Sequence, residues 1–225
     1  MKSQQSGFTL VEIAIVLVII GLLLGGILKG QELINSAKVK NLANDFRVIP
    51  TYIYAYQDRF KALPGDDSAV VNHLPGATLG TGGTPGNGVI EGHWNADETS
   101  TIESNIFWQH VRLANLAAGP TTPAAGFAPV NAVGGRVGVT SATSTEVIGG
   151  LAGTYMVCSG GIQGRFAKQL DVQMDDGDTT KGSLRVVADG TASGGAAIPN
   201  NGCAAGAADS ACVNDGGTYT VCMAF

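Results

Sequence analysis

A run of 21 residues from Phe8 to Leu28, FTLVEIAIVLVIIGLLLGGIL, constrains the fold of this chain more than any other feature. As a helix rising about 1.5 Å per residue, the run is roughly 32 Å long, which spans the hydrocarbon core of a membrane. A removable secretory signal has a shorter apolar region of about 7–15 residues, followed by a small-residue cleavage site. The longer run, with no such site behind it, predicts a retained membrane-spanning helix.

Glu12 is the one ionisable residue in this run. A carboxylate inside a membrane helix costs about 2.5–3.5 kcal/mol on insertion scales unless it finds a partner. The nearest basic residue in the sequence after it, Lys29, stands more than four helical turns away. A cut between Gly7 and Phe8 would create an α-amine one turn from Glu12, or within reach of Glu12 on a neighbouring helix. The alternative is a hydrated glutamate at the membrane interface.

The hexapeptide Gly7-Phe8-Thr9-Leu10-Val11-Glu12 resembles the prepilin processing motif of type IV pilins and type II secretion pseudopilins. The resemblance implies that residues 1–7 are a leader, which a prepilin peptidase removes after Gly7. It further implies methylation of Phe8 and a role for Glu12 in guiding subunit assembly. The precursor is then expected to be a single-pass protein of the bacterial inner membrane, later assembled with itself or other pilins into an extracellular or periplasmic filament.

Residues 29–63 continue the helix as an amphipathic segment. Apolar residues recur there at alternating spacings of three and four, which is one stripe of a helix: Val39, Leu42, Phe46, Ile49, Ile53, Tyr56, Phe60 and Leu63. We expect this stripe to pack against a globular head, although coiled-coil pairing is the competing interpretation. Pro50 is expected to bend the helix, and Leu63-Pro64-Gly65 to end it. Gly21, Gly25, Gly26 and Gly30 would permit close helix approach or local melting.

Residues 64–225 are expected to form the head. A loop-rich region over residues 66–98 precedes a second helix at about 101–117, with Ser100 and Glu103 as a capping box. Between residues 120 and 225 the sequence predicts short strands separated by turns: Arg136–Thr140, Glu146–Ile148, Thr154–Val157, Ser183–Val187 and Tyr219–Met223. Together with the resemblance, the pattern indicates an α+β pilin fold, with the long helix packed on an antiparallel sheet.

Three segments extend the resemblance beyond the N-terminus. Residues 56–67, 107–110 and 165–182 are similar to stretches in a group of large proteobacterial pilin-like proteins. The role of that group is less well defined than the role of the major pilins.

All four cysteines lie in the last third of the chain, at positions 158, 203, 212 and 222. Their even number beyond a membrane segment indicates disulfides in an oxidising compartment. Of the three possible pairings, the strand-like surroundings of Cys158 and Cys222 favour joining these two, which leaves Cys203 to pair with Cys212. Free thiols or a metal site are less favoured, because no CxxC motif is present.

Two acidic stretches are candidates for a hard cation such as Ca²⁺. One contains Asn87 and Glu91, and the other contains Asp171, Asp175, Asp176 and Asp178. In both stretches a plain polar turn is the favoured interpretation, so no cofactor is expected.

Enzymatic signatures are absent from the sequence, which has no HExxH, GxSxG or GxxxxGK[ST] motif. The three histidines, His73, His93 and His110, are scattered at spacings that indicate no shared site. The net charge is −5 and no Lys/Arg run is interleaved with aromatics, so broad nucleic-acid binding is not expected.

The predicted function is that of a pilus-like structural subunit. The alternatives are a pseudopilin of a type II secretion system and a monomeric membrane-anchored periplasmic binding module.

Overall fold

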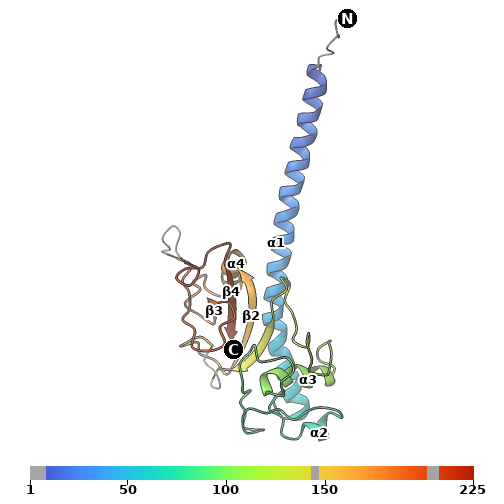
Figure 1. Cartoon of the computed structure of the whole chain (residues 1–225), viewed down its shortest axis with the longest axis vertical. Coiled ribbons are helices and arrows are strands. Elements are labelled where there is room, and N and C mark those ends of the chain that lie inside the picture. Colours follow the sequence, from blue (N-terminus) through green and yellow to red (C-terminus); the bar gives the residue numbers. More distant parts are fainter. Residues whose placement is uncertain (1–8, 143–146, 202–207) are drawn as a thin grey trace, which may run out of the picture. The chain divides into compact units, whose positions relative to one another are not determined.

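The computed structural model of the protein describes residues 9–142, 147–201 and 208–225 (Figure 1). Its helices are α1 (Leu10–Phe60), α2 (Val70–His73), α3 (Glu103–Leu113) and α4 (Gly164–Met174). Its strands are β1 (Val137–Ser141), β2 (Tyr155–Gln163), β3 (Leu184–Ala188) and β4 (Thr218–Ala224). A long N-terminal helix with a C-terminal antiparallel sheet confirms the predicted α+β, pilin-like arrangement. The chain divides into two compact units, residues 1–38 and 39–225.

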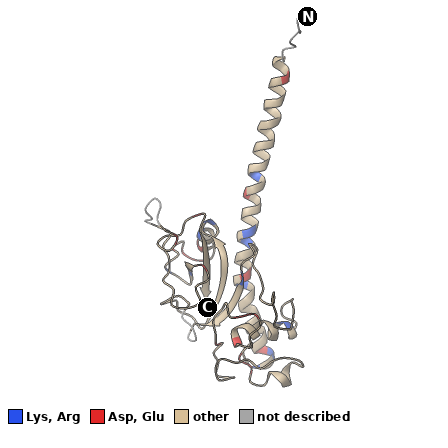
Figure 2. Ribbon diagram, in the orientation of Figure 1, with Lys and Arg blue, Asp and Glu red and all other residues tan. Residues whose placement is uncertain are grey.

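The first unit contains the apolar part of α1. Its large side chains face outward, for example Leu10 at 92% and Leu22 at 73% exposure. No charged residue lies between Glu12 and Lys29 in this stretch (Figure 2). Within the described residues, α1 is the one helix that is long and apolar enough to cross a membrane, judged by length and composition.

The second unit begins with the amphipathic part of α1. The predicted stripe is confirmed, because its members from Val39 to Tyr56 are buried. The helix ends at Phe60 and not at Leu63, since Lys61 adopts a left-handed conformation with φ of 56°. Leu63 is nevertheless buried beyond the helix end. Pro50 lies inside α1, which continues past it, and the predicted bend stays a prediction.

The four strands form one antiparallel sheet in the order β1-β2-β4-β3. Because side chains alternate across a strand, every second residue enters the main core. The residues on this face are Val137, Val139, Tyr155, Val157, Leu184, Val186, Tyr219 and Val221. They share that core with Phe46 and Ile53 of α1, Phe107 of α3, and Phe166 and Leu170 of α4. One face of the sheet is therefore covered by helices.

The opposite face of the sheet is buried in a smaller cluster. Met156, Cys158, Val187, Cys222 and Ala224 pack there. Loop residues close over them: Trp94, Val147, Ile148 and Leu151. Burial on both faces explains why apolar residues stand on both faces of the strands, with Arg185 as the one charged residue among them.

The sequence predicts a strand over residues 146–148. Glu146 lies outside the described residues, and for Val147 and Ile148 the prediction is wrong. Ile148 forms a single parallel bridge with Gly195. The turn at Gly149 and Gly150, where Gly150 has φ of 72°, ends the pairing before a strand can develop.

Two helix predictions also need correction. Helix α4 occupies a region in which only strands were expected. Helix α3 is shorter than the predicted 101–117 and has Ile102 at its N-cap position without a side-chain cap. The Ser100–Glu103 capping box is wrong, because the Ser100 hydroxyl donates to the Asp97 carbonyl at 2.7 Å. The Glu103 carboxylate accepts instead from the Glu91 amide at 2.9 Å.

Candidate functional sites

The N-terminal turn of α1 holds Glu12 against Thr9. The Thr9 backbone N–H and hydroxyl donate to Glu12 Oε2 at 2.8 and 2.7 Å, and the Glu12 N–H donates to Thr9 Oγ1 at 3.3 Å. This reciprocal pattern is a capping box, which satisfies orphan donors of the first turn and places a negative charge at the positive end of the helix. Gly7 and Phe8 lie outside the described residues. The contact between the Phe8 amine and Glu12 therefore stays a prediction.

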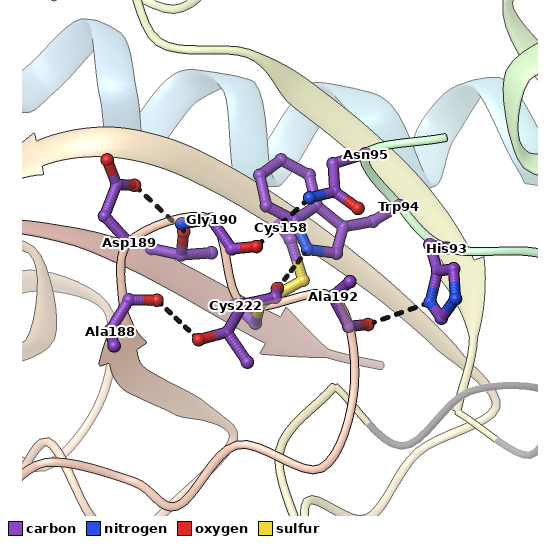
Figure 3. Close-up of a disulfide and its surroundings, with 11 residues drawn as sticks. His93, Trp94, Asn95, Cys158, Ala188, Asp189, Gly190, Ala192 and Cys222 are labelled. Carbon is purple, nitrogen blue, oxygen red and sulfur yellow. Dashed lines mark hydrogen bonds between the residues drawn. A yellow bond between two sulfur atoms is a disulfide. The ribbon is translucent and has the colours of Figure 1, made fainter. Parts of the chain in front are cut away.

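A disulfide joins Cys158 of β2 to Cys222 of β4, as expected (Figure 3). The two residues are direct cross-strand partners and both are fully buried. Trp94 covers them, and its indole N–H donates to the Thr191 carbonyl at 2.7 Å. Cys212 is buried, whereas Cys203 lies outside the described residues, so the Cys203–Cys212 pairing stays a prediction.

The histidines have structural partners. His73 Nδ1 lies 2.7 Å from Asp67 Oδ2, which also accepts from the Tyr56 hydroxyl at 2.8 Å. His110 accepts from the Gly65 amide at 2.9 Å through Nδ1 and contacts the Thr78 carbonyl at 2.9 Å through Nε2. Burial lowers the pKa of His110, which keeps the imidazole neutral. The contacts of His73 and His110 stabilise the turn that follows α1, which contains Gly65 and Asp67.

The first acidic group contains one of the two predicted residues. Glu91 meets Asp66 and Glu103, and one carboxylate oxygen of each lies within 4.8 Å of the others. We name these three residues the Asp66 cluster. Asn87 supports the group, because its side-chain N–H donates to Glu91 Oε1 at 2.6 Å while its own oxygen accepts from the Val89 amide at 2.8 Å. Asp66 and Glu103 were not predicted, since neither stands near Glu91 in the sequence.

The second acidic group contains Asp171, Asp175 and Asp176, at the C-terminal end of α4. Asp171 is fully buried, and no side chain of the described residues donates a hydrogen bond to either of its oxygens. Burial, followed by the nearby Asp175 and Asp176 charges, raises the pKa of Asp171 to about 7. Asp178 is not part of this group. It pairs with Lys181 at 2.7 Å, and this contact is the main cause that lowers its pKa to about 2.

The long N-terminal helix and the antiparallel sheet define the chain as a pilin-like α+β protein. Residues 2–28 match the family described as the prokaryotic N-terminal methylation motif, which supports the type IV pilin and pseudopilin superfamily. No curated protein and no solved structure matches the chain. The further resemblance to a group of large proteobacterial pilin-like proteins is therefore not confirmed.

Proposed function

We propose that this protein is a structural subunit of a type IV pilus-like filament. The observation that carries the proposal is the methylation motif at residues 2–28, in register with the apolar part of α1. In the proposed sequence of events a prepilin peptidase cuts after Gly7, Phe8 is methylated, and the subunit leaves the bacterial inner membrane for the filament. The protein acts by assembling, not by catalysing a reaction.

The exposed side chains of residues 10–28 support this proposal on physical grounds. So many outward-facing apolar residues require a non-aqueous environment. Lipid supplies it for the precursor, and neighbouring α1 helices supply it in a filament. A Cβ atom added at Gly21, Gly25 or Gly26 would meet nothing within 4 Å among the residues that the structure describes. These glycines are therefore not needed for packing within the subunit, and their small size is available for close approach between subunits.

The proposal is tested by shearing cells that produce the protein with a tag on the head. A filament subunit is recovered in the sheared fraction, and antibody labelling marks the length of the fibres or their tips. Labelling confined to short periplasmic fibres would instead support the pseudopilin alternative. A protein that stays entirely with the membrane, as a monomer, would contradict filament assembly and support a tethered binding module.

A further inference from the structure

Asp66, Glu91 and Glu103 come together from three separate segments of the head. Asp66 belongs to the turn after α1, Glu91 to the long loop, and Glu103 is the first residue of α3. Within the described residues, no Lys, Arg or His forms an ion pair with any of them. Three carboxylates of like charge are thus concentrated without a protein cation.

The cluster is also withdrawn from water. Glu103 is 0% and Asp66 is 2% exposed. Glu103 Oε1 and Glu91 Oε2 are buried, and no amide, hydroxyl or basic group of the described residues donates a hydrogen bond to them. Burial, with the closeness of Glu91 and Asp66, raises the pKa of Glu103. A buried carboxylate oxygen that accepts no hydrogen bond is costly, and a protein compensates for it with a proton or a metal ion.

The remaining oxygens are held by backbone amides, so the carboxylates have a fixed scaffold. Asp66 accepts from the amides of Gly86, Asn87 and Gly88, the last at 2.7 Å. Glu103 Oε2 accepts from the Glu91 amide. The backbone closes tightly around the group, because a Cβ at Gly83 would overlap the Glu91 carboxylate. This scaffold leaves two oxygens, Glu91 Oε2 and Glu103 Oε1, available to bind a cation.

The donor set selects the kind of ion. The cluster offers carboxylate oxygens and contains no His or Cys, which suits a hard cation. Ca²⁺ binds oxygen at about 2.3–2.6 Å in adaptable geometry, whereas Mg²⁺ requires near-ideal octahedral geometry at about 2.0–2.1 Å. Carboxylates drawn from three separate segments fit the more tolerant ion. A cavity of about 470 Å³ reaches the cluster at Asp66 and is lined also by Ser68, Gly86 and Gly88, whereas Glu91 and Glu103 do not line it.

We propose that Asp66, Glu91 and Glu103 bind one calcium ion, which ties the turn after α1 to the long loop and to the start of α3. Bound calcium offsets two of the three negative charges of the carboxylates and stabilises the loop region against unfolding. The proposal does not depend on filament assembly, since all three residues lie within the head.

The test uses the full chain in detergent, stripped with EGTA. Calcium binding is counted by equilibrium dialysis with radioactive calcium, and Tm is measured with EGTA, calcium or magnesium. Glu103→Gln keeps the size of the side chain and removes its charge. Glu91→Gln does the same at a less buried position, in case the first variant does not fold. Glu32→Gln, on a side chain that is 68% exposed, is the matched control.

We expect wild type and Glu32→Gln to bind one more calcium ion per chain than Glu103→Gln or Glu91→Gln. At calcium about 100 times Kd, this site should raise the wild-type Tm by about 5–10 °C. In EGTA, Glu103→Gln should be at least as stable as wild type, because glutamine imitates the protonated glutamate. Equal calcium counts in wild type and both glutamine variants would overturn the proposal. So would a rise in Tm with magnesium but not with calcium.

Discussion

Thr9 and Glu12 cap the first turn of α1 reciprocally, with the Thr9 amide 2.8 Å from Glu12 Oε2 and the Glu12 amide 3.3 Å from Thr9 Oγ1. Glu12 thus has a partner inside the chain before any neighbouring subunit is considered. The structure shows the carboxylate as a helix cap, whereas its pairing with the amine of Phe8 after processing stays a prediction.

Substitutions at these two positions separate the roles. Glu12→Gln preserves the capping hydrogen bond, because an amide oxygen also accepts from the Thr9 amide, but it removes the charge. Thr9→Ala removes the cap, at about 1 kcal/mol, and keeps the charge. If the charge guides assembly, Glu12→Gln should be processed yet missing from sheared filaments, while Thr9→Ala assembles. Normal assembly of Glu12→Gln would refute the pairing between Glu12 and the Phe8 amine.

Two isoleucines on α1, one in each compact unit, test whether the apolar part of the helix contributes to the stability of the head. Ile53 is fully buried in the main core, and Ile19 is 51% exposed in the apolar part. Ile53→Ala should lower the free energy of unfolding of the head by about 2–5 kcal/mol, since it deletes buried methyl groups and leaves a cavity. Ile19→Ala should leave the urea denaturation of the head unchanged. Equal effects of the two substitutions on that denaturation curve would contradict the assigned burial.

The disulfide between Cys158 and Cys222 closes a sequence separation of 64 residues. Replacing both cysteines with alanine should lower stability by about 2–5 kcal/mol, because the unfolded chain regains conformational freedom and the buried sulfur atoms are lost. The measurement is the urea midpoint of the oxidised protein. A reductant should shift the wild-type midpoint towards that of the double variant. No shift on reduction would indicate that this bridge contributes nothing to stability.

The titration of Asp171 gives a prediction with a definite sign. Its pKa is about 7 in the folded protein and 3.8 as the ordinary value. The folded state therefore retains a proton that the unfolded chain releases, and the resulting stability is full below about pH 4 and lost as pH rises through about 7. In EGTA, Asp171→Asn should gain about 1–4 kcal/mol relative to wild type between about pH 4 and pH 8. The control is Asp58→Asn, a substitution of an aspartate whose side chain is 91% exposed. Parallel pH profiles for wild type and Asp171→Asn would contradict the assignment.

The spacing of apolar residues was sufficient to predict the amphipathic part of α1 and most of the strands, because one side or both sides of these elements are buried along their length. The stripe from Val39 to Tyr56 and the strands around Val139, Val157, Val186 and Val221 follow from apolar spacing or from β-branched runs. Helix α4 was missed although it is as long as α3, and although the burial of Phe166, Ala167 and Leu170 follows helical spacing. The apolar residues of α4 therefore do predict a helix, but the aspartates at positions 171, 175 and 176 drew the interpretation towards an acidic turn.

Tertiary contacts explain the other differences. The capping box was assigned to Ser100 and Glu103, but Glu103 turns towards Asp66 and Glu91. The pattern that does form a capping box, at Thr9 and Glu12, was interpreted as a processing motif alone. Of the three members of the Asp66 cluster, the sequence singled out only Glu91 as a candidate for cation binding, together with its neighbour Asn87. The other two carboxylates, on Asp66 and Glu103, belong to segments far from Glu91 in the sequence. Local spacing in the sequence cannot predict that these side chains lie close together.

The central claim is that the chain is processed and assembled through its N-terminus, and mass spectrometry of sheared, assembled protein tests it most directly. The account predicts a mature chain that begins at Phe8 and carries one methyl group on its amine. A Gly7→Ala variant should be cut less efficiently and accumulate in the membrane with its leader attached. Recovery of the intact Met1 N-terminus from assembled filaments would contradict the account.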